Sequence, residues 1–415
     1  MAVPKLRFPE FTDDWEQRKL GDLGSLKNGM NFSKDAMGHG YAFVNLQNIF
    51  GNNVVEAKSL GLAEASEKQL LEYSLQKGDV LFVRSSVKLE GVGEVALVAE
   101  NLENTTYSGF IIRFRDGYGL NNDFKKFVFA TKKVRDQIMS QATNSANKNI
   151  SQSVLENLTF EIPSKDEQKQ IGEFFSNLDN LITLHQRKLE DLRILKKSML
   201  QKMFPSEGNS VPEVRFPEFT AAWEQRKFGD VFEEYSEKNH EDLPPLTIVQ
   251  GSGTIPREES GRDIKYDKSS LNNYKLVNPG DFILHLRSFE GGLEVANSQG
   301  IVSPAYHIFR GIRTDSRFYY PFFRSHDFIN ILLKPHVYGI RDGKSIDVEG
   351  MKSIKIPYPD FDEQKRIGDF FDHLDNAITL HQRKRDDLKD LKRVFLYRIS
   401  LKSPSRRRIW QDELL

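Results

Sequence analysis

The chain has 415 residues, 59 basic and 59 acidic side chains, a formal net charge of zero and no cysteine. The lack of cysteine excludes disulfides, thiolate metal sites and cysteine nucleophiles, and the balanced charge gives no overall attraction to nucleic acid or membrane. No apolar run approaches the length that crosses a bilayer. The first residues lack the apolar stretch of a signal peptide, so we expect a cytoplasmic protein.

The first predicted element is a short segment that occurs twice. Residues 3–23 return as residues 211–231, with 15 of 21 positions identical. Two near-identical segments favour one kind of partner bound twice, and the repeated aromatic residues are the predicted contacts. They are Phe8, Phe11 and Trp15 in the first copy and Phe216, Phe219 and Trp223 in the second.

Each copy is followed by a region that differs between the two halves and mixes helix and strand patterns. At 78–84 and 280–287, Gly-Asp turns precede runs of β-branched and aromatic residues that are typical of strands. Short helices are predicted around 123–140 and 318–333. The sequence therefore predicts an α+β fold class with two mixed α/β domains.

Loops in these divergent regions carry basic, small and amide-bearing residues at matching places. Such side chains contact base edges in a groove and hold phosphates, although each one alone could be a solvated surface residue. The predicted DNA contacts are Arg84, Ser85, Lys88, Asn144, Asn147 and Lys148 in the first region and Arg287, Ser288, Arg341 and Lys344 in the second. A helix that faces phosphates could also carry Lys125, Lys126, Lys132, Lys133 and Arg135.

A second repeated block predicts two long helices. Residues 166–200 return as residues 362–396, with 23 of 35 positions identical. Ser164 with Glu167, and Asp360 with Glu363, fit capping boxes at the helix starts. Apolar residues three and four apart form one stripe on each helix, so the helices can pair as a coiled coil or pack on their own domains. The predicted pairing residues are Leu178, Ile182, His185, Leu192, Leu374, Ile378, His381 and Leu388.

The sequence offers no convincing catalytic or metal site. The nine histidines form no cluster with metal-ligand spacing. The segment at 242–246 has two prolines after an aspartate, but it lacks the aromatic residue that would stack on a flipped base. We therefore predict no catalytic residues, no metal ligands and no cofactor bound by this chain.

The alternation of two divergent domains with two repeated helices resembles the specificity subunit of a type I restriction-modification system. The resemblance rests on the RFPEFTxxWEQRKxGD segments, the Glu-Gln pairs at 167–168 and 363–364, and the LDNxITLHQRK helix cores. It implies that each domain recognises one half of a split site in double-stranded DNA and that the helices pair antiparallel. It also implies two modification subunits that carry S-adenosylmethionine, and two restriction subunits that use ATP and magnesium.

The predicted organisation has an internal pseudo-two-fold repeat. Target-recognition domains occupy 1–163 and 205–359, conserved helices occupy 164–204 and 360–402, and a tail without an assigned role occupies 403–415. Two alternatives stay open. The chain could be a stand-alone DNA-binding or adaptor protein without methyltransferase partners, which co-purification would test. It could also be a self-contained nuclease or methyltransferase, which assays of the chain with magnesium or S-adenosylmethionine would test.

Overall fold

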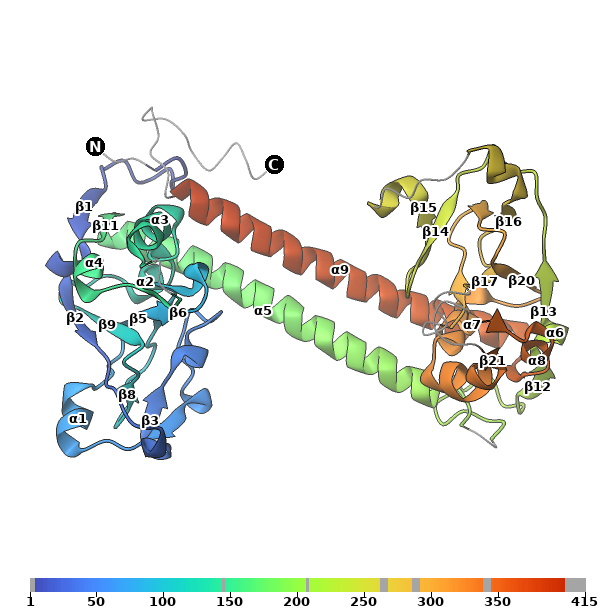
Figure 1. The fold of residues 1–415 in the computed structure, drawn as a ribbon, viewed down its shortest axis with the longest axis horizontal. Helices are drawn as coiled ribbons and strands as arrows, with labels where there is room; N and C mark the ends of the chain where they lie inside the picture. The colour runs from blue at the N-terminus through green and yellow to red at the C-terminus, as the bar shows by residue number, and fades with distance from the viewer. Residues whose placement is uncertain are drawn as a thin grey trace. The chain divides into compact units, whose positions relative to one another are not determined.

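The computed structural model describes residues 4–143, 146–206, 209–261, 268–285, 292–338 and 345–399 (Figure 1). The chain divides into two compact units. The first comprises Met1–His185 and Lys384–Leu415, and the second comprises Gln186–Arg383. The unit boundary falls inside both long helices, so each unit holds one divergent region, the start of one long helix and the end of the other. Five predicted DNA contacts and the tail lie outside the described residues: Asn144, Arg287, Ser288, Arg341, Lys344 and residues 403–415.

The first unit is built on a four-stranded antiparallel sheet in the order β2-β9-β5-β7. Val80 and Phe82 of β5 pack into one apolar cluster, whereas Leu81 and Val83 pack into another on the opposite face. Because both faces are covered, this strand is apolar at every position instead of alternating. The four strands are β2 (Gly24–Asn28), β5 (Val80–Val83), β7 (Val95–Leu97) and β9 (Ile111–Asp116).

Shorter elements surround this sheet. The predicted helix around 123–140 is two helices, with Thr131 at the N-cap position of the second, where its hydroxyl donates to the Val128 carbonyl (2.7 Å) and not to the cap. The helices are α1 (Glu67–Glu72), α2 (Asn122–Val128), α3 (Lys132–Gln141) and α4 (Gln152–Glu156). The strands are β1 (Glu16–Lys19) with β11 (Thr159–Ile162), β3 (Met37–Val44) with β4 (Gly61–Ala63) and β8 (Thr106–Tyr107), and β6 (Ser85–Ser86) with β10 (Lys148–Asn149).

The second unit has a sheet of the same design, in the order β13-β20-β17-β18. Its strands are β13 (Phe232–Tyr235), β17 (Phe282–Leu284), β18 (Glu294–Val295) and β20 (His307–Gly311). The remaining strands are β12 (Glu224–Lys227) with β23 (Lys355–Tyr358), β14 (Leu246–Val249) with β15 (Gly253–Pro256), β16 (Lys275–Val277) with β19 (Gly300–Val302), and β21 (Val337–Tyr338) with β22 (Ser345–Ile346). The helices are α6 (Phe228–Val231), α7 (Ser316–Phe323) and α8 (Val348–Lys352).

One buried ion pair marks the two sheets as equivalent. Asp79, the residue before β5, accepts two hydrogen bonds from Arg115 of β9 at 2.9 and 2.7 Å. Asp281, the residue before β17, accepts two from Arg310 of β20 at 2.8 and 2.7 Å. The divergent regions therefore share one fold although their sequences have little in common, and the predicted α+β class is confirmed.

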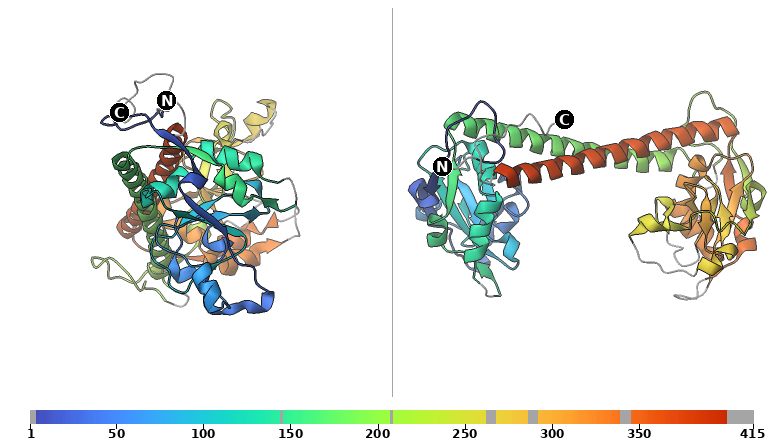
Figure 2. Two further views of the ribbon diagram at one scale, coloured as in Figure 1. Left: turned by 90° about the vertical axis from the view of Figure 1, so that its left-hand side faces the viewer. Right: turned by 90° about the horizontal axis from the view of Figure 1, so that it is seen from above.

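The long helices α5 (Lys165–Lys202) and α9 (Phe361–Ile399) run antiparallel within each unit (Figure 2). In the first unit Asp179 pairs with Lys392 at 2.5 Å, while Phe174, earlier in α5, meets Phe395, later in α9. In the second unit Lys196 pairs with Asp375 at 2.5 Å, while Arg193, earlier in α5, meets Gln382, later in α9, at 3.4 Å. No helix among the described residues combines the length and apolar character needed to cross a membrane.

The predicted pairing stripes lie in the two cores. Leu178 and the partly buried Leu388 belong to the core of the first unit, and Leu192, Leu374 and Ile378 belong to that of the second. Ile182, His185 and His381 are half-buried. Both alternatives left open by the sequence therefore occur: each helix packs on a domain, and it also packs on the other helix.

Candidate nucleic-acid interface

The repeated segments form a joint at the start of each long helix. In the first unit Arg7 donates through Nε and Nη2 to the two carboxylate oxygens of Glu167, both at 2.8 Å. The indole nitrogen of Trp15 donates to the same carboxylate at 3.1 Å. In the second unit Arg215 and Trp223 bind Glu363 in the same way, at 2.6, 2.7 and 2.9 Å.

This joint corrects part of the capping prediction. Ser164 and Asp360 do cap the helices, because their side chains accept from the backbone amides of Glu167 (3.3 Å) and Glu363 (3.0 Å). The two glutamate carboxylates, however, are fully buried and bind the arginine and tryptophan of the repeated segment instead of the cap. The reciprocal half of the predicted capping box was therefore wrong.

A second repeated pair ties the divergent domain to the helix. Gln168 accepts from the Asn121 amide at 3.0 Å, and Gln364 accepts from the Asp315 amide at the same distance. One turn later, a Cβ at Gly172 would lie 2.7 Å from the backbone nitrogen of Phe124. The divergent domain therefore approaches the helix too closely for any side chain at this glycine.

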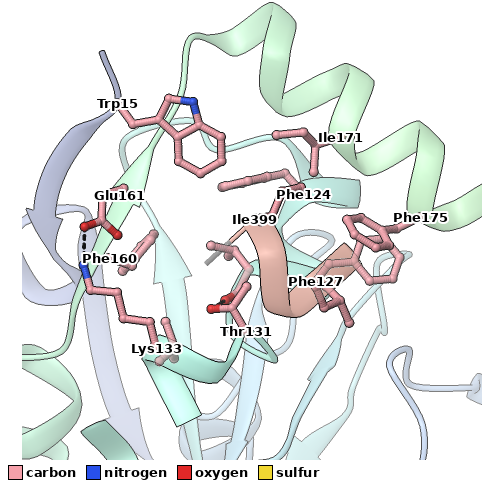
Figure 3. A pocket seen from close by; sticks show the side chains of 13 residues that line it. Trp15, Phe124, Phe127, Thr131, Lys133, Phe160, Glu161, Ile171, Phe175 and Ile399 are labelled. Atoms are coloured by element: carbon pink, nitrogen blue, oxygen red, sulfur yellow. Dashed lines mark hydrogen bonds and ion pairs between the residues drawn. The ribbon is translucent and has the colours of Figure 1, made fainter. Parts of the chain in front are cut away.

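Apolar side chains fill the joint of the first unit (Figure 3). Trp15, Phe124 and Ile171 approach one another there, with Phe175 and Ile399 beside them. The remaining cavity is about 20 Å³ and mostly apolar, enough for little more than one water molecule. The joint is consequently a structural core and not a small-molecule site.

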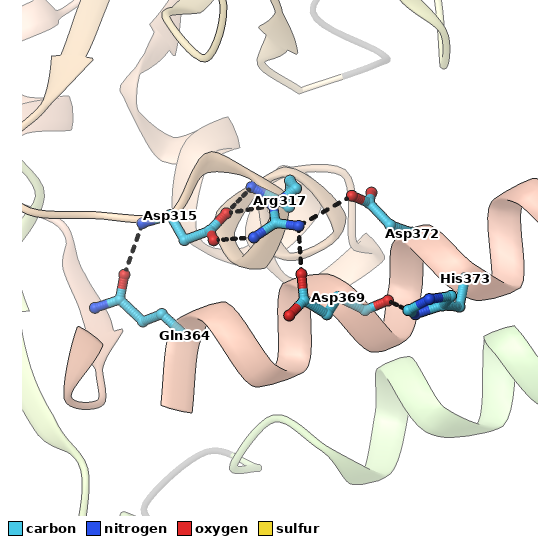
Figure 4. Close-up of polar contacts among 6 residues, drawn as sticks. All are labelled: Asp315, Arg317, Gln364, Asp369, Asp372 and His373. Carbon is cyan, nitrogen blue, oxygen red and sulfur yellow. Dashed lines mark hydrogen bonds and ion pairs between the residues drawn. The ribbon is translucent and has the colours of Figure 1, made fainter. Parts of the chain in front are cut away.

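A cluster of charges holds the joint of the second unit (Figure 4). Arg317, in the first turn of α7, donates to Asp315 and also to Asp369 and Asp372 of α9. The hydrogen bonds that the Asp315 carboxylate accepts from Arg317 raise the pKa of Arg317 above its usual range, with burial opposing them. Arg317 therefore stays charged and links the divergent domain to the long helix.

The predicted partner contacts occupy these joints to different degrees. Trp15 and Trp223 are 8% and 3% exposed, so they have an intramolecular role and offer little surface to another protein. Phe8 and Phe216 are half-buried and pack edge-on against Phe174 and Phe370 of the helices. Phe11 and Phe219 are also half-buried. Partner contact by these six residues stays a prediction.

The structure brings together the two candidate DNA-contacting loops of the first unit. β6 pairs with β10, so that Ser86 lies opposite Lys148 and Ser85 opposite Asn149. Lys88 and Asn147 are exposed and Lys148 is half-buried. Together with neighbouring residues, the loops border an open hollow of about 520 Å³. We call this the β6–β10 hollow.

Arg84 and Ser85 hold these loops in place. The Arg84 guanidinium donates to the Gly109 carbonyl at 3.3 Å, and its backbone amide donates to the Phe110 carbonyl at 2.7 Å. The Arg84 carbonyl accepts from the Ile150 amide at 3.0 Å. Ser85 is 9% exposed. Base contact by either residue stays a prediction, but both have structural contacts that the sequence did not indicate.

In the second unit fewer of the candidate DNA-contacting residues can be placed, because residues 286–291 and 339–344 lie outside the part of the chain that the structure describes. A hollow of about 530 Å³ lies beside β14 and β15. His285 and Tyr306 line it, with their ring centres 4.7 Å apart. The lining residues differ from those of the β6–β10 hollow, although the underlying sheet is equivalent.

Of the five residues predicted on a phosphate-facing basic helix of the first unit, Lys125 is contradicted by the structure, and the others stay a prediction. Lys125 is buried and donates to the Gly78 carbonyl at 2.8 Å, and burial lowers its pKa although Asp116 opposes this. Arg135 donates to the carbonyls of Val92 and Glu90. The other three are ion-paired, Lys126 with Asp123, Lys132 with Asp136 and Lys133 with Glu161. Within the described residues no group of side chains could hold a metal ion.

The fold thus defines a protein with two recognition domains of one design, fixed by identical joints to a helix pair and presenting different loops. A family model described as the type I restriction modification DNA specificity domain matches residues 12–193 and again residues 221–390. The chain belongs to this family, and its general function is DNA recognition as the specificity subunit of a type I restriction-modification system.

Named relatives and a solved structure agree with this assignment. The putative type I restriction enzyme MjaX specificity subunit of Methanocaldococcus jannaschii is 24% identical over 420 residues, covering 94% of each chain. The MjaVIII specificity subunit of that organism is 23% identical over 94% of this chain and 92% of its own. The crystal structure of an S subunit from M. genitalium has a TM-score of 0.59 at 16% identity, covering 97% of this chain and 100% of the other, and shows the shared fold.

Proposed function

We propose that each recognition domain binds one half of an asymmetric, bipartite DNA site and that the helix pair sets the spacer between the halves. One observation carries this proposal: the two units repeat the same sheet and the same joints, while the loops beside the sheets differ. Two copies of the same scaffold are suited to two segments of one DNA duplex, and different loops are suited to different half-sites. The 38 residues of α5 span about 57 Å at about 1.5 Å per residue, enough to separate two recognition domains.

We further propose that each repeat binds one modification subunit through an exposed patch on its long helix. Leu184 and Leu380 occupy the same place in the two repeats and are 61% and 51% exposed. Their neighbours Asn180 and Thr183 recur as Asn376 and Thr379, all of them exposed. The leucine is identical and exposed in both copies, as binding of the same partner to each repeat would require.

In this proposal the chain supplies recognition and its partners supply the chemistry. S-adenosylmethionine belongs to the two modification subunits, and ATP and magnesium belong to two restriction subunits of the full complex. The lack of a catalytic motif in the sequence supports a non-catalytic role. The net charge of zero is compatible with DNA binding if the partner subunits neutralise many of the phosphates.

Exchange of one recognition domain tests the proposal. Residues 24–160, between the repeated blocks, would be replaced by the matching region of a relative, so that the joint of Arg7 and Trp15 with Glu167 is kept. The methylated adenines would then be mapped in cells that also contain the modification subunit. We expect one half-site to change while the other half-site and the spacer stay the same. A change in both half-sites would contradict independent domains, and failure to co-purify with a modification subunit would favour the stand-alone DNA-binding protein.

A further inference from the structure

An exposed aromatic side chain stands on a rigid turn beside the β6–β10 hollow. Phe110 is 56% exposed, yet its turn is fully tied: the Gly109 amide donates to the Met30 carbonyl at 2.7 Å, and the Ile111 amide donates to the Ser108 carbonyl at 2.9 Å. A Cβ at position 109 would lie 2.0 Å from Oδ1 of Asn31. A larger residue at position 109 would require the Asn31 side chain to move, and the hydrogen-bonded backbone of the turn holds the phenyl ring in solvent.

The second unit has the same turn with a different side chain at its tip. The Tyr306 amide donates to the Ser303 carbonyl at 3.1 Å, and the Ala305 amide donates to the Ser303 hydroxyl at 3.4 Å. In the first unit the Phe110 amide likewise donates to the Ser108 hydroxyl, at 3.3 Å. Phe110 and the exposed Ala305 are thus equivalent. A partner that binds both repeats alike would not require this difference, whereas a target with two different halves would.

The hollow next to Phe110 has an apolar wall and a polar rim. Phe50 and Val87 line it, 37% and 77% exposed. The Phe50 ring would lie 3.0 Å from a Cβ on Gly91, so the floor is closely packed. Patches of exposed apolar side chains of this kind mark interaction surfaces.

Charges around the hollow favour a base edge over a phosphate as its occupant. Glu90 and Glu94 line the hollow and would repel a phosphate placed inside it. Lys88 lies on the rim of the hollow, and Lys148 lies on the neighbouring strand β10. From these places both lysines can reach phosphates of the DNA backbone on either side of a bound base. Among base edges in the major groove, only thymine presents a methyl group, which binds apolar side chains.

We propose that Phe110, with Phe50 and Val87, binds the 5-methyl group of a thymine in the half-site recognised by the first domain. This inference rests on the proposed function, and it names a chemical feature of the DNA that the first domain selects. The second domain, with Ala305 at the same turn, makes no such contact through that position.

The test uses the complex assembled with its modification subunits and the site found by adenine mapping. Each thymine of the first half-site is replaced, one at a time, by deoxyuridine, which lacks only the methyl group. At one position we expect affinity to fall roughly fourfold, the factor that corresponds to about 0.8 kcal/mol for one buried methyl-sized group. In Phe110→Ala the difference between the thymine and deoxyuridine duplexes should shrink at that position, because only Phe50 and Val87 remain beside the methyl group, and Phe110→Leu should keep more of the difference.

Controls separate this contact from other roles. Leu71→Ala removes an apolar side chain that is 81% exposed in the same domain and should leave the thymine preference intact. The inference is overturned if the wild-type complex shows no thymine preference in that half-site. It is also overturned if Phe110→Ala weakens both duplexes equally, as a wedge between bases would, or lowers binding of the modification subunit. If the complex methylates no specific site, the proposed function itself fails.

Discussion

At the residue scale, the repeated identities are explained first by contacts inside the chain. Glu167 and Glu363 are buried carboxylates, and each accepts hydrogen bonds from an arginine and a tryptophan of the repeated segment. A buried charge is tolerated only when it is paired. The glutamate, arginine and tryptophan are therefore required together at each joint, independent of any partner.

Removing one of these charges should destabilise the first unit. We expect Glu167→Gln to lower the free energy of unfolding by about 3–5 kcal/mol, because Arg7, only 7% exposed, would be left buried without its counter-charge. Glu173→Gln is the matched control, since Glu173 is 56% exposed and lies 3.9 Å from Lys169; it should change stability by less than about 1 kcal/mol. Urea unfolding measures both. Equal effects of the two substitutions would contradict the role given to the joint.

At the element scale, the long helices present different surfaces along their length. Most of their shared residues serve the joints and the apolar stripes, but Leu184 and Leu380 remain exposed in both copies. Ile194 is also exposed, at 59%, yet its counterpart in the other repeat is Asp390. This contrast separates an apolar residue that both repeats keep from one that only a single repeat has.

Aspartate substitutions test the exposed patch on each helix. We expect Leu184→Asp to weaken binding of one modification subunit by about 1–2 kcal/mol, roughly five- to thirtyfold in Kd, and the double change with Leu380→Asp to weaken both. Ile194→Asp introduces the residue that the other repeat already has, so it should bind normally. Native mass spectrometry counts the bound subunits. If all three variants assemble like the wild type, the patch is not the docking site.

At the scale of the whole molecule, the antiparallel helix pair is proposed to set the DNA spacer. Counted from the Asp179–Lys392 pair, the points between residues 185 and 186 and between 385 and 386 lie opposite each other. Seven residues inserted at both points keep the apolar stripes in phase and add about 10.5 Å to each helix. We expect the mapped spacer to lengthen by about three base pairs, at about 3.4 Å each, with both half-sites unchanged. The same spacer after insertion would exclude the helices as its determinant.

The sequence predicted the features that depend on local pattern and repetition. The two long helices, their caps and the α+β class follow from spacing and from the duplicated blocks. The glutamate joints did not, because Arg7 and Glu167 lie 160 residues apart and no local pattern connects them. The β6–β10 pairing and the exposure of Phe110 were missed for the same reason. Lys125 shows the opposite error, since a lysine in a basic run was expected outside and is buried.

The identical joints have a consequence for how such a chain can change its target. A backbone amide of each recognition domain donates to the side chain of Gln168 or Gln364 on a long helix. The domain also packs against a glycine of that helix, Gly172 or Gly368. These backbone contacts do not depend on which domain is present, whereas the contacts of Arg317 with Asp369 and Asp372 belong to the second unit alone. A gene rearranged to exchange the domains would keep the shared contacts, lose those of Arg317, and encode a protein that recognises the two halves of its site in the reverse order.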